Sequence, residues 1–305
     1  MSLIDSYSGN SLADRYITQR AASPIVSSAA VYQIARELIS NCCRGHDACP
    51  RENNTQLPTR VLDLSSTHSN IALLYETKGI QGRYAALSYC WGKAKQQIMT
   101  TRKTLESGDL QIKIQHLPKT LQNAISVTGE LGIKYLWIDS LCIIQNDNDD
   151  KAREIFQMPA IYKSAIVTTS AAIADECNKG FLDDRKEIAM RVEYSFRLPL
   201  IRDITADNPA RSDIFLCTDS NFGYTIKDFE NEPIDYRAWT FQEAWLSPRL
   251  LIYGSGQVQW RCLSKKLTYG LPERIHKFDY KEHAMAPEYQ GESSSSGSHL
   301  RKARA

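Results

Sequence analysis

The sequence predicts an α/β fold with a mostly parallel sheet, helices on both faces and a β-hairpin near the C-terminal end. From Tyr84 onward, short apolar runs alternate with segments whose apolar residues recur at helical spacing, which is typical of βα units. The runs at 84–89, 135–139 and 165–170 have the length and composition of buried strands. With 305 residues, 42% of them hydrophobic, the chain is long enough for one large domain or two of ordinary size.

The remaining elements follow from local patterns in chain order. Pro118 near a first turn and Gly132 just past the last periodic residue delimit one helix, and Gly-Ser-Gly at 254–256 separates the strands of the expected hairpin. In the helix after the acidic turn, Pro159 should produce a kink. Helices are expected over 29–39, 117–131, 150–163 and 237–246. Further strands are expected at 60–64, 71–75, 197–200, 214–217, 250–253 and 257–262.

The domain organisation follows from these patterns. Residues 1–56 form an N-terminal helix and polar loop, and residues 57–265 form the main domain, with its core at 84–250. Residues 266–305 are a C-terminal extension, which we expect to be disordered from about 290 because its composition is of low complexity.

Composition and charge exclude several classes of protein. Lys+Arg 37 against Asp+Glu 35 gives a net charge of +2, too balanced for a protein that binds nucleic acid over its whole surface. No apolar stretch is long enough to span a membrane, and the N-terminus lacks the pattern of a secretory signal. Eight cysteines in dissimilar surroundings fit a reducing compartment, so we expect a cytoplasmic protein. The common nucleotide-binding, hydrolase and zinc-protease motifs are absent, and no cofactor is predicted.

One cluster has residue types that bind metals. Cys42, Cys43, His46 and Cys49 lie within eight residues, and zinc prefers such ligands. Structural zinc sites usually combine ligands from two separate segments, however, and no second half is evident. A polar loop is therefore the preferred interpretation, and no metal site is predicted.

Acidic residues at the ends of strands and helices are the best candidates for chemistry, because ligands of open α/β sheets bind outside the carboxyl ends of the strands. Asp139 ends a predicted strand, and Glu154 lies about one turn into a helix if Asp150 caps it. An ionised carboxylate there suits an oxocarbenium-like sugar centre. A solvated Glu154 paired with Lys151 or Arg153, and an Asp139 that only caps its turn, are the structural alternatives.

Aromatic side chains give one further candidate. Trp91 follows a strand end and precedes Gly92, so we expect it to stack on a ligand, together with the turn that contains Ser88 and Tyr89. The other tryptophans, at 137, 239, 245 and 260, are expected in the core. Glu243 is expected to form a structural ion pair with Arg237 or Arg249.

Several long motifs resemble the fungal heterokaryon-incompatibility (HET) domain, and they occur in that family's order. They are Tyr84 to Gly92 (YAALSYCWG), Leu117-Pro118, Leu131 to Gln145 (LGIKYLWIDSLCIIQ), Met158 to Tyr162, and Arg237 to Arg249 (RAWTFQEAWLSPR). The last of these includes Arg237, Trp239, Gln242 and Glu243, which we assign to the structural motif. The sequence departs from the family pattern at Asn123, where Asp is usual, and at Pro159.

The resemblance implies a role in fungal non-self recognition, in which HET domains trigger programmed cell death as part of innate immunity. Expected partners are other incompatibility proteins or a second copy of the chain. The family is also similar to Toll/interleukin-1 receptor (TIR) domains, which implies a flavodoxin-like fold and, as an alternative function, hydrolysis of NAD. By order of elements, the catalytic carboxylate of those domains corresponds to Glu154. Asp139 would then hold ribose hydroxyls or orient water, while Ser88, Tyr89, Trp91 and Gly92 would contact the substrate.

Overall fold

The computed structural model describes the chain in segments: residues 2–5, 24–51, 54–92, 98–108, 110–185, 196–202, 210–217, 232–256, 258–264 and 266–268. The chain divides into two compact units, Met1–Glu273 and Arg274–Ala305. The second unit, which contains the tail expected to be disordered, lies outside the described residues.

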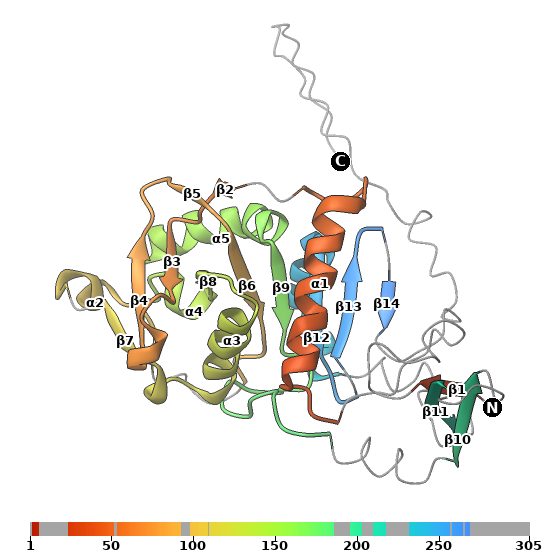
Figure 1. The fold of residues 1–305 in the computed structure, drawn as a ribbon. Coiled ribbons are helices and arrows are strands. Elements are labelled where there is room, and N and C mark those ends of the chain that lie inside the picture. The colour runs from red at the N-terminus through yellow and green to blue at the C-terminus, as the bar shows by residue number, and fades with distance from the viewer. Residues whose placement is uncertain are drawn as a thin grey trace, which may run out of the picture. The chain divides into compact units, whose positions relative to one another are not determined.

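A nine-stranded sheet forms the centre of the first unit (Figure 1). Its strands occur in the order β14-β13-β12-β9-β6-β8-β3-β4-β7. In chain order they are β3 (Arg60–Asp63), β4 (Ile71–Glu76), β6 (Tyr84–Ser88), β7 (Gln111–Lys113), β8 (Tyr135–Trp137), β9 (Val167–Ser170), β12 (Arg249–Tyr253), β13 (Val258–Cys262) and β14 (Lys266–Thr268). All seven strands predicted for this sheet are present, whereas β7 and β14 are additional.

The sheet is mixed, and the prediction of a mostly parallel sheet is wrong. Only the four central strands β12, β9, β6 and β8 are parallel to their neighbours in that group. The outer strands pair antiparallel, because β3 and β4 are joined by a short turn, as are β12 and β13. The predicted C-terminal hairpin is confirmed, and it continues the main sheet instead of standing apart.

Two smaller sheets complete the described strands. One contains β1 (Ser2–Asp5), β11 (Ala210–Cys217) and β10 (Phe196–Arg202) in that order, and the other pairs β2 (Thr55–Gln56) with β5 (Gln81–Gly82). The strands expected at 197–200 and 214–217 are therefore confirmed as the antiparallel pair β10 and β11. The strand β1 was not expected in the polar N-terminal segment.

Helices cover both faces of the main sheet. They are α1 (Ala29–Gly45), α2 (Arg102–Glu106), α3 (Lys119–Glu130), α4 (Asp139–Cys142), α5 (Asn148–Ser164) and α7 (Ala238–Leu246), with short 3₁₀ turns at Thr67–Ser69, Ile114–His116 and Pro233–Tyr236. Figure 1 shows α1 and α3 on the viewer's side of the sheet. No helix among the described residues combines the length and the apolar character needed to cross a membrane.

The fully buried strand β6 separates the two halves of the core. Ala85 and Leu87 belong to the cluster that includes buried residues of α1 and α3, whereas Tyr84 and Ala86 pack with residues of α5 and α7. Successive side chains of a strand point to opposite faces of the sheet, and both faces are covered here. A continuous apolar run, without polar alternation, therefore forms this central strand.

The helix α5 begins earlier than predicted. Its N-cap is Asp147, whose side chain accepts hydrogen bonds from the backbone N–H groups of Asp149 and Asp150. Asp150 was predicted to cap this helix, but it lies inside the first turn and is buried. The helix continues through Pro159 to Ser164.

Candidate functional site

The order of the parallel strands creates a topological switch point at the carboxyl ends of the central strands. Numbered along the chain, β6, β8, β9 and β12 occur across the sheet in the order 2-1-3-4. The chain therefore leaves β6 toward β8 on one side, while β9 lies on the other side. In open α/β sheets, ligands bind outside the carboxyl ends of the strands at such a point. The residues that follow β6 and β8 are thus the first place to look for a site.

A buried hydrogen bond links the end of β6 to α7. The Ser88 hydroxyl donates to Glu243 Oε2 across 2.5 Å, and the two residues are only 2% and 7% exposed. The helix α7 packs against both β6 and α5. The end of β6 and the last motif of the domain therefore meet here, although Ser88 and Glu243 are 155 residues apart in the chain. Ser88 was predicted as a site residue. Glu243 was assigned only a structural role, because no local pattern indicates that a helical glutamate faces a distant strand end.

A second carboxylate lies at the end of β8. Asp139 starts the short helix α4, and its Oδ2 accepts a hydrogen bond from Trp91 Nε1 at 2.9 Å. Its Oδ1 accepts the backbone N–H of Ser140 at 2.6 Å, and the Ser140 hydroxyl accepts from the Tyr89 hydroxyl at 2.8 Å. Asp139 and Trp91, each of which was expected to contact the substrate, are therefore in direct contact with each other. The indole is held edge-on to the carboxylate by its N–H group.

Arg237 and Gly92 shape the loop after β6. Arg237 Nη1 donates to the Tyr89 carbonyl oxygen at 2.9 Å, which joins the segment before α7 to this loop. Gly92 has a φ of +78°, and a Cβ at this position would collide with the Glu176 side chain and lie 2.9 Å from the Glu176 Cα. The role that the structure supports for Gly92 is therefore a tight turn and a close backbone approach.

The two carboxylates have raised pKa values. The pKa of Glu243 is raised to about 7, mainly by burial and also by the charge of Asp139, against the opposing effects of the Ser88 hydrogen bond and the Arg237 charge. Burial likewise raises the pKa of Asp139 to about 6, against the opposing hydrogen bonds from Trp91 and the Ser140 N–H. Paired acids with pKa values near neutrality are typical of sites that exchange protons with a ligand.

Glu154 lies elsewhere, against β3. It is fully buried, with Oε1 3.8 Å from Arg60 Nη2 and 3.6 Å from Arg153 Nε. Arg60 also pairs with Asp150 at 2.5 Å and donates to the Cys142 carbonyl oxygen at 2.7 Å. The solvated helix-surface position considered for Glu154 is wrong, although the contact with Arg153 is present. Within the part of the chain that the structure describes, Glu154 contacts these two arginines and makes no hydrogen bond or ion pair with Trp91 or Asp139.

The other residues of the last motif have different surroundings. Trp239 is 60% exposed and Gln242 is also exposed, and Trp245 is 43% exposed, so the expectation of a core position fails for these two tryptophans. Trp137 and Trp260 are buried as expected. Within the described residues, Glu243 forms no ion pair with Arg237 or Arg249, because each guanidinium donates to backbone carbonyls instead.

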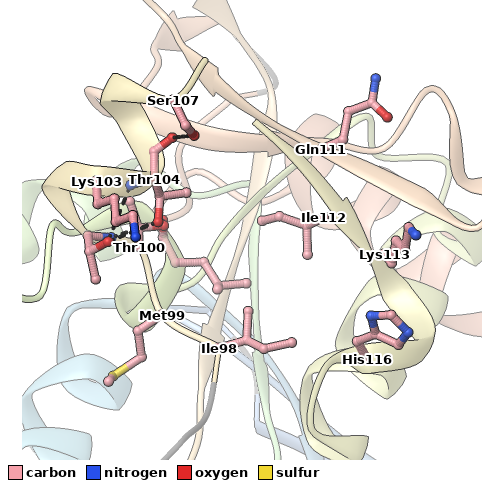
Figure 2. Close-up of a pocket in the computed structure, with 12 residues that line it drawn as sticks. Ile98, Met99, Thr100, Lys103, Thr104, Ser107, Gln111, Ile112, Lys113 and His116 are labelled. Carbon is pink, nitrogen blue, oxygen red and sulfur yellow. Dashed lines mark hydrogen bonds between the residues drawn. The ribbon is translucent and has the colours of Figure 1, made fainter. Parts of the chain in front are cut away.

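A separate pocket of about 540 Å³ lies beside α4 (Figure 2). Figure 2 shows Thr100, Lys103 and Thr104 on one wall and Lys113 and His116 on the other. Among the residues named above as site candidates, none lines this pocket.

Three of the four residues considered as metal ligands, for which a polar loop was the preferred interpretation, lie together. The ligand atoms of Cys42, His46 and Cys49 lie close together, and Cys262 from β13 completes the group in place of Cys43. Cys43 is buried in the core next to this group. Cys262 was missed because it is separated from the other three by more than 200 residues, and a cysteine that ends an apolar strand gives no signal of its own.

Comparison with known proteins identifies the domain that carries the switch-point residues. The family model described as heterokaryon incompatibility protein (HET) matches residues 84–243, just over half of the chain. This range begins at β6 and ends at Glu243, so it contains Ser88, Trp91, Asp139 and Glu243 together. No curated protein and no solved structure gives a significant match. The chain belongs to the heterokaryon incompatibility (HET) family.

Proposed function

We propose that this protein is an effector of fungal heterokaryon incompatibility that triggers cell death, and that its acting part is the carboxylate site at the switch point. The family match supports a role in heterokaryon incompatibility in general. The observation that carries the proposal further is the buried hydrogen bond between Ser88 and Glu243, which joins the first and last motifs of the matched region in one site.

The 2-1-3-4 order of the parallel strands also supports a flavodoxin-like interpretation of the core, since the same order begins the flavodoxin sheet. The similarity to TIR domains is part of the same proposal. The antiparallel strands on both sides of the central group are an addition to that pattern.

Regulated expression in a fungal host tests the proposal. The wild-type protein is expected to reduce viability, and Glu243→Gln is expected to abolish this effect at equal protein level. Glu106→Gln is the matched control, because Glu106 is an exposed glutamate at the end of α2 and is not among the residues assigned to the site. Killing by the Glu243 variant at the wild-type level would contradict the assignment of the acting site.

Hydrolysis of NAD is the second candidate function, favoured by two carboxylates of raised pKa, one of which accepts a hydrogen bond from the Trp91 indole. In this reaction the bond between ribose C1′ and nicotinamide breaks, and its electron pair leaves with the nicotinamide. An ionised carboxylate stabilises the positive charge that develops at C1′. Water then adds to C1′ and releases a proton to solvent, so that the products are ADP-ribose and nicotinamide.

Glu243 and Glu154 are alternative catalytic carboxylates for this reaction. Glu154 corresponds by order of elements to the carboxylate of TIR domains, but its charge is already balanced by Arg60 and Arg153. Glu243 lies at the switch point and is paired with a neutral hydroxyl. We therefore favour Glu243.

Release of nicotinamide by the purified protein distinguishes these cases. Loss of activity in Glu243→Gln with retention in Glu154→Gln supports Glu243, and the reverse pattern supports Glu154. Absence of release from the wild-type protein, in the presence of cell killing, would leave the effector function and remove the enzymatic one.

Association with a second copy is the mode of action that we propose for the non-enzymatic case. Large apolar side chains are exposed on the adjacent helices α5 and α7, among them Phe156 at 85% and Phe241 at 69% exposure. Exposed aromatic groups of this kind are enriched in protein interfaces.

A further inference from the structure

Four metal-ligand side chains from two distant segments meet at one end of α1. Cys42 lies in the last turn of the helix, His46 is its C-cap, and Cys49 follows in the next turn. Cys262 is the last residue of β13, which is in contact with α1. The three sulfur atoms and a ring nitrogen all lie within 4.8 Å of one another.

The distances are those of a tetrahedral zinc site. Zinc binds sulfur at about 2.3 Å and histidine nitrogen at about 2.0–2.1 Å, so tetrahedral geometry separates a sulfur from the nitrogen by about 3.6 Å. Cys262 Sγ and Cys49 Sγ lie 3.4 and 3.8 Å from His46 Nδ1. One metal ion at the centre of the group would therefore contact all four ligands with little movement.

The backbone holds this geometry in place. The N–H group of His46 donates to the Cys42 carbonyl oxygen at 3.4 Å, and the N–H group of Cys49 donates to the His46 carbonyl oxygen at 3.2 Å. These bonds end α1 and hold Cys42, His46 and Cys49 on the helix side of the cluster. On the other side, Cys262 is fixed by its position in the ladder between β12 and β13.

A buried positive charge accompanies the cluster. Arg249 is directly opposite Cys262 in that ladder, is only 1% exposed, and donates from Nε to Cys42 Sγ at 3.1 Å. Its other donors bond the carbonyl oxygens of Ile166 and Pro50. Within the described part of the chain it forms no ion pair with a carboxylate. A buried arginine is costly without an anion, so thiolates in the cluster would stabilise it.

We propose that Cys42, His46, Cys49 and Cys262 bind one structural zinc ion. Three thiolates and Zn²⁺ give the site a net charge of −1, which the Arg249 guanidinium neutralises. The ligands lie before and after the matched region 84–243, so the metal joins the N-terminal helix to the C-terminal hairpin. The site is independent of the chemistry proposed for Ser88 and Glu243.

Metal analysis of the purified full chain tests this site. We expect about one zinc ion per chain in the wild-type protein and in Cys43→Ala, and loss of the metal in Cys262→Ala. Cys43 is a matched control because it is buried and adjacent in sequence to a ligand, but it does not belong to the cluster. In addition, Co²⁺ added to chelator-treated wild-type protein should give the absorption of a tetrahedral cobalt–thiolate centre.

The outcomes are decisive in both directions. Stoichiometric zinc in Cys262→Ala would overturn the proposal. So would wild-type protein that contains no zinc and gives no cobalt–thiolate bands, or a disulfide between two of these cysteines in protein purified without oxidant. If Cys262→Ala does not fold, the cobalt spectrum of the wild-type protein decides the question alone.

Discussion

Replacement of Glu243 by glutamine should stabilise the protein at high pH, although it removes a side chain from the proposed site. Glutamine resembles the protonated acid in shape and in hydrogen bonding, but it has no charge to bury. The pKa of Glu243 rises from an ordinary value of 4.5 to about 7 in the folded protein, mainly because the side chain is buried. This rise corresponds to about 3 kcal/mol of folding free energy.

The direction of the effect follows from which state holds the proton. Below about pH 4, Glu243 is protonated in the folded and the unfolded protein, and the group does not affect stability. Between about pH 4.5 and 7 the unfolded chain ionises first, so stability falls as the pH rises. Above about pH 7 the loss is complete. The variant should therefore exceed the wild type by about 3 kcal/mol at pH 8 and by less than about 1 kcal/mol at pH 5.

Thermal and urea unfolding at the two pH values measure this difference. For a domain of this size, each kcal/mol corresponds to roughly 2–4 °C in Tm. Glu106→Gln serves as the control and should change little at either pH, because the side chain of Glu106 is exposed. A Glu243 variant that is equally or less stable than the wild type at pH 8 would refute the interpretation of Glu243 as a buried acid of raised pKa.

Three further predictions concern other parts of the structure. Gly92→Ala should lower the free energy of unfolding by about 1–3 kcal/mol, because the position combines a positive φ with a collision of the added Cβ with Glu176. An unchanged urea midpoint would disprove the tight turn. Arg60→Met should destabilise the protein by about 3–5 kcal/mol, because it leaves the buried Asp150 and Glu154 with only the half-exposed Arg153 as a counter-charge. Arg153→Ala should lower the free energy of unfolding by at most about 1 kcal/mol. Equal effects of the two substitutions would contradict the buried ion pair. The double variant Phe156→Ser/Phe241→Ser should reduce self-association in analytical ultracentrifugation while changing stability by less than about 0.5 kcal/mol, and undiminished association would exclude this surface.

The sequence was informative wherever structure depends on local pattern. The apolar run of β6, the helix that follows Pro118 and the hairpin around Gly-Ser-Gly were all identified, because each is encoded within a few neighbouring residues. Two residues of the candidate site, Ser88 and Asp139, were predicted for the same reason. Ser88 is the last residue of β6, and Asp139 comes just after β8.

Features that depend on tertiary pairing were not predictable in this way. The periodicity of a strand does not say whether its neighbour is parallel, so the antiparallel outer strands were missed. Glu154 was expected near the surface or the site, yet Arg60 from a distant strand permits its burial. The partners Glu243 and Cys262 each lie more than 150 residues from the side chains that they meet.

A double-mutant cycle between Ser88 and Glu243 tests the central claim most directly, since that claim is that the two ends of the matched region form one buried site. Urea unfolding at pH 8 would be measured for the wild type, Ser88→Ala, Glu243→Ala and the double variant, since alanine, unlike glutamine, leaves no acceptor for the Ser88 hydroxyl. The hydrogen bond of 2.5 Å predicts a coupling energy of about 1–3 kcal/mol, because the hydroxyl supports the ionised carboxylate. Additive effects, with a coupling below about 0.3 kcal/mol, would show that the two side chains do not interact and would contradict the account.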